Sequence, residues 1–305
     1  MFKKLKYGII GAGHLGGYHA MQINEIKLAE LVGVYDILDH SSHSLAKKYN
    51  TQQYLSVEEL MQECDALSIA TPATNHFEVS KTALNSNCHL FIEKPFTKTI
   101  SEAKELITLR NKKNLKIQVG HIERFNAAFL QLLKNNPKPE FIECHRLSNY
   151  NPRGTDVDVI LDLMVHDIDL ILRLVPSKIK NIYASGKAVL TDSIDLANSR
   201  IEFDNGCTVN LTASRISLKQ MRQMRLFEKK SYSMIDFSVP SLNTWEINEQ
   251  KKLQETQYTL DSTNALYEEL FCFINSIHAN TGVAVPAEEA LETLEIAEQI
   301  QKIIE

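Results

Sequence analysis

The chain has 305 residues, 44% hydrophobic and 23% charged, which is typical of a globular protein, and its formal net charge of −5 argues against a surface devoted to nucleic acid. Its five cysteines form no CxxC pair or Cys/His cluster, so we expect neither a zinc site nor a disulfide framework. The sequence has no signal-peptide pattern and no apolar run of the roughly 20 residues that span a bilayer, so we expect a cytoplasmic protein without a membrane partner.

Short apolar runs alternate with helical stretches over the first 120 residues. The runs lie at residues 7–10, 31–35, 66–70, 89–92 and 117–119. Such alternation is typical of βαβ units, which build a parallel sheet with helices on both faces. We therefore predict an α/β protein whose first domain, residues 1–120, is a doubly wound Rossmann domain.

Longer strand-like segments follow, together with one strong helix at residues 158–174. These segments lie at residues 140–149, 179–190, 195–204, 207–216 and 222–237. Asn205-Gly206 favours a two-residue hairpin turn, because both positions tolerate a positive φ. We predict an α+β domain at residues 121–285 with a large, mostly antiparallel open sheet, and a C-terminal helix at 286–305 that returns to the core.

A dinucleotide fingerprint follows the first strand. Gly11 permits a tight turn, Gly13 lets the backbone approach a pyrophosphate, and Gly16 allows the helix to pack closely on the sheet. Asp36 ends the next strand, 20 residues beyond Gly16, where a carboxylate accepts hydrogen bonds from the adenosine ribose and repels a 2′-phosphate. The pattern predicts NAD rather than NADP as cofactor, and a glycine turn in some other α/β protein is the alternative interpretation.

Two further motifs carry candidate acid/base chemistry. Lys94, in Glu93-Lys94-Pro95, follows a buried strand at the sheet edge where ligands bind, although a surface lysine is the alternative. Asp162, His166 and Asp169 are spaced by four and three residues and so share one helix face. A carboxylate one turn before a histidine can fix its tautomer, although a buried polar pair is the alternative. The same face has no second histidine, so we predict no metal site.

These motifs, together with Thr71-Pro72, resemble those of the glucose-fructose oxidoreductase, inositol dehydrogenase and rhizopine-catabolism (Gfo/Idh/MocA) family. The resemblance implies that Lys94 and His166 are acid/base groups, that Asp162 supports the substrate, and that the bond between Lys94 and Pro95 is cis. It also implies a homodimer or homotetramer formed through the open face of the C-terminal sheet. The positions assigned to NAD are Gly11, Gly13, His14, Leu15, Gly16, Asp36, Thr71, Pro72, His76, Glu93 and Lys94.

Basic residues near these motifs suggest a phosphate-bearing substrate. Residues 215–230 contain six basic residues and one acidic residue. Arginine suits a bidentate grip on phosphate oxygens, which a free hexose does not need. The positions assigned to the substrate are His121, Glu123, Arg124, Asn151, Arg153 and His166.

The segments GHIERFN, NPRG and LDLMVHDID also resemble the branch of the family that oxidises the 3-hydroxyl of UDP-N-acetylglucosamine on the way to the 2,3-diamino sugars of lipid A. Dehydrogenation of a free sugar, inositol or an amino-acid-derived substrate stays open as an alternative. Two further alternatives stay open. The chain could catalyse a redox-neutral reaction with permanently bound NAD, or it could be a non-catalytic regulatory protein that binds NAD.

Overall fold

The computed structural model describes two compact units of the chain. The described residues are 3–151, 156–260 and 263–305. The first unit comprises Met1–His121 and Leu266–Glu292, and the second comprises Ile122–Ala265 and Thr293–Glu305. The predicted domains divide after residues 120 and 285, whereas these units divide after residues 121, 265 and 292.

The first unit contains a six-stranded parallel sheet with the strand order β3-β2-β1-β4-β5-β6. Its strands are β1 (Leu5–Ile10), β2 (Ala29–Tyr35), β3 (Gln52–Gln53), β4 (Ala66–Ile69), β5 (His89–Glu93) and β6 (Ile117–Gly120). All five predicted strands are present, and only the two-residue β3 was not predicted. The doubly wound Rossmann fold is therefore confirmed.

Helices pack on this sheet. They are α1 (His14–Glu25), α2 (Asp39–Tyr49), α3 (Val57–Glu63), the 3₁₀ turn η1 (Ala73–Asn75), α4 (His76–Asn85), α5 (Ile100–Lys113) and α8 (Ala265–His278). A capping box between Thr99 and Glu102 fixes the start of α5. Helix α8 belongs to this unit because Phe273 packs edge-to-face on Tyr7 and Phe91 in the core.

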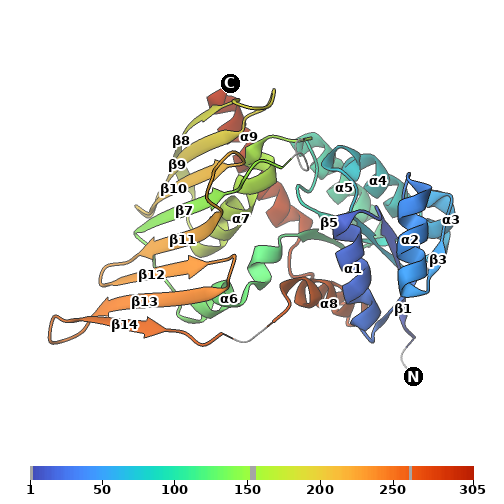
Figure 1. Ribbon diagram of the computed structural model, residues 1–305, viewed down its shortest axis with the longest axis horizontal. Coiled ribbons are helices and arrows are strands. Elements are labelled where there is room, and N and C mark those ends of the chain that lie inside the picture. The colour runs from blue at the N-terminus through green and yellow to red at the C-terminus, as the bar shows by residue number, and fades with distance from the viewer. Residues whose placement is uncertain (1–2, 152–155, 261–262) are drawn as a thin grey trace. The chain divides into compact units, whose positions relative to one another are not determined.

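The second unit contains an eight-stranded sheet with the order β14-β13-β12-β11-β7-β10-β9-β8 (Figure 1). Its strands are β7 (Phe141–Leu147), β8 (Ile179–Lys187), β9 (Leu196–Phe203), β10 (Thr208–Ser214), β11 (Met221–Phe227), β12 (Ser231–Asp236), β13 (Ser241–Ile247) and β14 (Leu253–Gln257). Every neighbouring pair is antiparallel except β7 and β10. The predicted mostly antiparallel sheet is confirmed.

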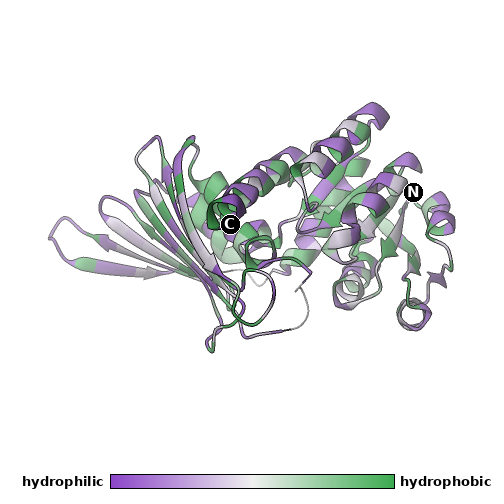
Figure 2. Ribbon diagram, turned by 90° about the horizontal axis from the view of Figure 1, so that it is seen from above, coloured by the Kyte–Doolittle hydropathy of each residue, from purple (hydrophilic) through white to green (hydrophobic). Residues whose placement is uncertain are grey.

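The helical elements of this unit lie on one side of its sheet (Figure 2). They are η2 (Ile122–Phe125), α6 (Ala127–Lys134), the π-helical turn η3 (Ile160–Met164), α7 (Val165–Leu174) and the last part of α9 (Ala287–Ile304). Helix α6 packs on β12 and β13, and η3 packs on β10. Within the described part of this unit, no helix covers the opposite face, which we call the open face.

Three local predictions are corrected by the structure. The segment expected as one strand at 222–237 is a hairpin, with the Glu228 N–H donating to the Ser231 carbonyl across its turn. The expected helix at 158–174 begins as a π-helical turn. Between β9 and β10 only Gly206 has a positive φ, +90°, and the loop holds three residues rather than two because Phe203 donates its N–H to the Cys207 carbonyl.

Candidate active site

The glycine-rich turn after β1 is shaped by close approaches of the backbone. Gly11 has a φ of +98°, and a Cβ there would lie 2.5 Å from the carbonyl oxygen of Ala70. A Cβ on Gly16 would lie 1.8 Å from the Gly11 carbonyl oxygen. Gly13 has no atom within 4 Å of an ideal Cβ, so it leaves space at the N-terminus of α1. This is the arrangement in which a helix N-terminus receives a phosphate group.

A pocket of about 410 Å³ opens at the carboxyl ends of β1, β2 and β4. Asp36 lies in its wall, and its carboxylate accepts hydrogen bonds from the backbone N–H groups of Ala12 (2.6 Å) and Leu38 (2.8 Å). The two N–H groups fix the carboxylate at the pocket edge. The pocket is lined by Ile10, Gly11, Gly13, Tyr35, Asp36, Ile37, Leu38, Val57, Ala70, Thr71, Pro72, Asn75 and Val79.

The residues of this pocket fit a dinucleotide. The Thr71 hydroxyl is buried and has no hydrogen-bond partner among the described residues, so it is available to a bound molecule. The backbone of Gly11 to Gly16 suits the pyrophosphate, and the Asp36 carboxylate has acceptor capacity left for ribose hydroxyls. Pro72 also lines the pocket, whereas His14 and Leu15 lie beside it at the start of α1, with Leu15 45% exposed.

The Glu93-Lys94-Pro95 turn lies at the end of β5, and its Lys94–Pro95 bond is cis, as the resemblance implied. Glu93 is buried and contacts the imidazole Nε2 of His19 at 2.8 Å. Burial raises the pKa of the Glu93 carboxyl, but the His19 hydrogen bond and the charges of His19, Lys94 and His76 outweigh it, so the pKa is lowered overall. The turn is therefore built around a buried carboxylate.

His19 is a site residue that the motif analysis missed. It lies on α1, its Nδ1 contacts the Ser68 hydroxyl at 2.8 Å, and the ring is fully buried between α1 and the sheet. Through Glu93 it connects the helix of the glycine motif to the turn that carries Lys94. A polar residue on the buried side of a helix, one turn after Gly16, is the only signal in the sequence that could have indicated it.

Helix α7 and the π-helical turn before it carry the second group of predicted residues. Asp162 and His166 are partly exposed, whereas Asp169 is buried. The Arg124 guanidinium donates to both carboxylate oxygens of Asp169, from Nε at 2.8 Å and from Nη2 at 2.6 Å. Asp169 therefore anchors α7 to η2, and Asp162 and His166 are the members of the predicted face that reach the surface.

A second buried ion cluster was not predicted. Arg146 of β7 donates to Asp167 through Nε (3.1 Å) and Nη2 (2.8 Å), and to Glu123 through Nη1 (2.8 Å). Burial raises the pKa of the Asp167 carboxyl, and the charge of Arg146 only partly offsets the effect. The structure thus places Glu123 and Arg124, both assigned to the substrate from the sequence, in buried ion pairs that join η2 to β7 and α7.

The remaining predicted substrate residues are spread over both units. His121 is buried directly after β6, and Asn151 is exposed. Arg153 lies outside the described residues. Of the basic segment 215–230, Arg215 is buried and donates to the Val157 carbonyl at 2.8 Å, and Arg225 pairs with Glu143 at 3.1 Å. The segment is therefore divided between structural contacts and the sheet surface.

Neither a metal cluster nor a membrane span is found in the described part of the chain. No group of three or more His, Cys, Asp and Glu side chains is arranged to hold a metal ion there. None of the helices in those residues is long and apolar enough to cross a bilayer. All five cysteines are free thiols.

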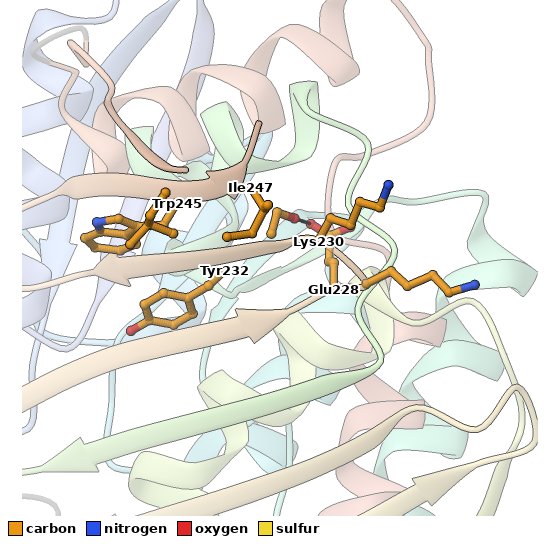
Figure 3. A pocket seen from close by; sticks show the side chains of 8 residues that line it. Glu228, Lys230, Tyr232, Trp245 and Ile247 are labelled. Atoms are coloured by element: carbon orange, nitrogen blue, oxygen red, sulfur yellow. Dashed lines mark hydrogen bonds between the residues drawn. The ribbon is translucent and has the colours of Figure 1, made fainter. Parts of the chain in front are cut away.

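The open face of the second unit carries an aromatic row, which we define as Phe141, Phe227, Tyr232 and Trp245. Tyr232 stacks on Phe227 and on Trp245, with ring centroids 4.9 Å and 5.0 Å apart. A pocket of about 450 Å³ borders the row, and Figure 3 shows Tyr232 and Trp245 projecting from neighbouring strands beside it. Four partly exposed aromatic rings in contact form an apolar strip across four strands.

Known protein families match residues in both units. An oxidoreductase family with an NAD-binding Rossmann fold matches residues 5–121, and the GFO/IDH/MocA C-terminal domain matches residues 117–230. UDP-N-acetylglucosamine 3-dehydrogenase of Acidithiobacillus ferrooxidans is 33% identical over 307 residues, which cover 99% of this chain and 97% of that protein. A solved structure of that enzyme has a TM-score of 0.93 and covers 99% of this chain and 98% of its own.

More distant structures share the fold. The apo scyllo-inositol dehydrogenase of Lactobacillus casei is 22% identical, with a TM-score of 0.82 over 100% of this chain and 97% of its own. The motifs, the strand order of the Rossmann sheet and the full-length similarity agree with one another. The chain therefore belongs to the GFO/IDH/MocA family of NAD-binding oxidoreductases.

Proposed function

We propose that the chain oxidises the 3-hydroxyl of UDP-N-acetylglucosamine to a keto group. The supporting observation is the 33% identity to UDP-N-acetylglucosamine 3-dehydrogenase over nearly the full length of both chains. The reaction removes a hydride from C3 and a proton from the hydroxyl oxygen. NAD, when bound, supplies the hydride acceptor.

The chain's own residues supply binding and proton transfer in this proposal. The Gly11–Gly16 backbone and Asp36 hold the dinucleotide, and the Thr71 hydroxyl offers it a buried hydrogen-bonding group. Lys94 and His166 are assigned to proton transfer, and Asp162 to orienting the substrate, as the family resemblance implies. Asp162 and His166 are partly exposed, which leaves them accessible to a sugar.

A substrate panel tests the proposal. Purified chain with NAD is supplied with UDP-N-acetylglucosamine, free N-acetylglucosamine, glucose and myo-inositol, and initial NADH formation is followed. An aminotransferase and glutamate remove the keto product, because oxidation of an alcohol by NAD is uphill. We expect the UDP sugar to have the highest kcat/KM.

Isotopic labelling locates the position oxidised. UDP-N-acetylglucosamine deuterated at C3 should transfer its deuterium to NADH, whereas the C4-deuterated compound should not. Faster turnover of glucose or inositol would replace the proposal by a free-polyol dehydrogenase, an activity found in scyllo-inositol 2-dehydrogenase of Bacillus subtilis, which is 24% identical over 71% of this chain. NAD binding without any turnover would favour the non-catalytic alternative.

We also propose that the chain forms a homodimer or homotetramer through the open face. The aromatic row supports this, because contiguous exposed apolar surface on a sheet is typical of an interface. A cytoplasmic location is proposed as well, and the five free thiols are consistent with a reducing compartment.

A further inference from the structure

His76 is held by two backbone carbonyl groups that come from different strand ends. It is the first residue of α4 and only 1% exposed. Its Nδ1 lies 2.8 Å from the carbonyl oxygen of Pro95, after β5, and its Nε2 lies 3.0 Å from the carbonyl oxygen of Thr71, after β4. The ring therefore bridges the turn that carries Lys94 and the residue that lines the dinucleotide pocket.

Two carbonyl partners determine the protonation state of the ring. A carbonyl oxygen only accepts hydrogen bonds, and a neutral imidazole has a single N–H, so it can satisfy one of the two carbonyls. Only the imidazolium donates from both nitrogens. Turning the ring over about its Cβ–Cγ bond would place ring carbons against both carbonyls, which would be worse for either form.

His19 provides an internal contrast. Its Nδ1 faces the Ser68 hydroxyl and its Nε2 faces the Glu93 carboxylate. A hydroxyl can donate or accept, so the neutral His19 ring can satisfy both of its contacts. The constraint on His76 thus follows from its particular partners and does not extend to every buried histidine.

A counter-charge for His76 is present in the same unit. Glu93 of β5 is buried, and the pKa of its carboxyl is lowered, so its carboxylate can serve as that counter-charge. The other groups whose charge acts on Glu93 are Lys94 and His19 of α1, and His19 also contacts the carboxylate directly. The Lys81–Glu105 ion pair of α4 and α5 lies nearer the surface. The first turn of α4 disfavours a cation, but the carboxylate and two carbonyls oppose that effect.

We propose that His76 is a permanently protonated positioning residue, which ties the end of β4 to the turn after β5 and so fixes Thr71 relative to Lys94. The proposal rests on the proposed function only in assigning Lys94 to the reaction. The protonation state itself can be measured on the protein without substrate or cofactor.

NMR of the ring nitrogens tests the protonation state. Long-range ¹H–¹⁵N correlations of the perdeuterated, ¹⁵N-labelled full chain are recorded at about pH 8, where a histidine of ordinary pKa is neutral. Comparison with the His76→Gln variant assigns the signal. We expect both His76 nitrogens to show the protonated shift, and the exposed His278, which faces a single carbonyl, is the reference histidine in the same spectrum. A bare nitrogen on His76 would overturn the proposal.

The positioning role has a second test. His76→Gln retains a polar side chain but cannot donate to both carbonyls from opposite ends of a ring, and His278→Gln is the matched control. We expect His76→Gln to lower kcat at least ~10-fold, with KM for the sugar within ~3-fold of wild type. His278→Gln should retain wild-type values.

The outcomes can be told apart. A folded His76→Gln protein with unchanged kcat would overturn the positioning role. If no substrate turns over, the proposed function fails while the NMR result still decides the protonation of His76. If His76→Gln does not fold, the ring nitrogen signals of His76 can be assigned in the wild-type protein alone, and they still decide whether the ring is protonated.

Discussion

Lys94 is the residue on which the proposed chemistry depends most directly. It is partly exposed at the end of β5, between the buried Glu93 and the cis bond to Pro95. We expect Lys94→Ala to slow hydride transfer by roughly 100- to 10,000-fold, the usual contribution of a general acid or base. NAD affinity should change little, because the pocket that fits the dinucleotide is lined by other residues.

Single-turnover stopped-flow measurement of NADH formation reports this step. The exposed Lys98→Ala variant, four residues along the chain, controls for loss of positive charge near the turn. If Lys94→Ala reduced NAD at the wild-type rate, Lys94 would have no place in the mechanism.

Asp36 is the residue that we expect to determine the choice between NAD and NADP. Its carboxylate faces the dinucleotide pocket and is fixed by the N–H groups of Ala12 and Leu38. Asp36→Ala should weaken NAD binding by roughly 10- to 150-fold, the equivalent of about 1.5–3 kcal/mol for a hydrogen bond to a charged group. Rejection of NADP should relax at the same time, because the charge that repels its 2′-phosphate is gone.

The isosteric Asp36→Asn variant separates charge from hydrogen bonding. It retains one acceptor oxygen, so it should lose less NAD affinity than Asp36→Ala but relax NADP rejection as much. Fluorescence titration with both cofactors gives the dissociation constants. Wild-type protein that bound NADP more tightly than NAD would contradict this role of Asp36.

The positions of residues with local signatures were predictable from the sequence, whereas pairs of residues brought together by distant contacts were not. Gly11, Asp36 and Lys94 stand at fixed places relative to strands, and the physical demands of a tight turn or a sheet edge restrict their identity. By contrast, His19 meets Glu93 across 74 positions of sequence, and Arg146 meets Asp167 across 21. Periodicity cannot reveal such pairs, because each partner read alone is an ordinary polar residue in an apolar segment.

At the level of elements, the prediction was limited by turns without glycine or proline. The hairpin between β11 and β12 turns at residues 228–230, Glu-Lys-Lys, so nothing in its composition marks a break. Strands β13 and β14 were missed because polar residues dominate them, and β14 is exposed along its whole length. The buried parallel strands were found because a strand covered on both faces is a continuous apolar run.

The loop between β8 and β9 depends on a single carboxylate. Asp195 is buried and accepts hydrogen bonds from the N–H groups of Val189, Leu190 and Thr191 and from the Thr191 hydroxyl. Burial acts to raise the pKa of Asp195, but these hydrogen bonds outweigh it and lower the pKa to about 2. The ionised carboxylate therefore fixes the backbone of residues 189–191 through these hydrogen bonds.

Stability should depend on pH through this group. Because the folded-state pKa is below the ordinary value, the stabilisation is complete above the ordinary value of 3.8 and is lost as the pH falls from there towards about 2. Asp195→Ala should lower the free energy of unfolding by about 2 kcal/mol or more at neutral pH. The difference in the free energy of unfolding between the wild-type protein and Asp195→Ala should become smaller as the pH falls from 3.8 towards about 2.

Urea denaturation across the acidic range measures this difference. The exposed Asp192→Ala, on the same loop, is the control and should leave stability nearly unchanged. A gap between wild type and Asp195→Ala that stayed constant down to the lowest pH would show that the carboxylate contributes equally when protonated, which is contrary to the prediction.

At the scale of the whole molecule, the proposed assembly depends on the open face of the second unit. Along β12, the side chains of Ser233 and Ile235 are buried on the helix-covered side, whereas Tyr232 and Met234 are only partly buried on the other. This alternation follows from the period of two in a strand, and it leaves the aromatic row on the uncovered side. Contiguous exposed apolar surface of this kind usually marks a site where a partner surface binds.

The association state tests this inference on assembly. We expect wild-type protein to run as a dimer or tetramer in size-exclusion chromatography with light scattering, and Trp245→Glu to dissociate it. Trp245 stacks on Tyr232, so the substitution both removes an aromatic contact and places a charge where an interface would have to desolvate it. Leu55→Glu makes the same kind of change at a 73% exposed position of the first unit and should leave the assembly intact. A wild-type monomer, or a Trp245→Glu assembly of unchanged mass and concentration dependence, would exclude the open face as the interface.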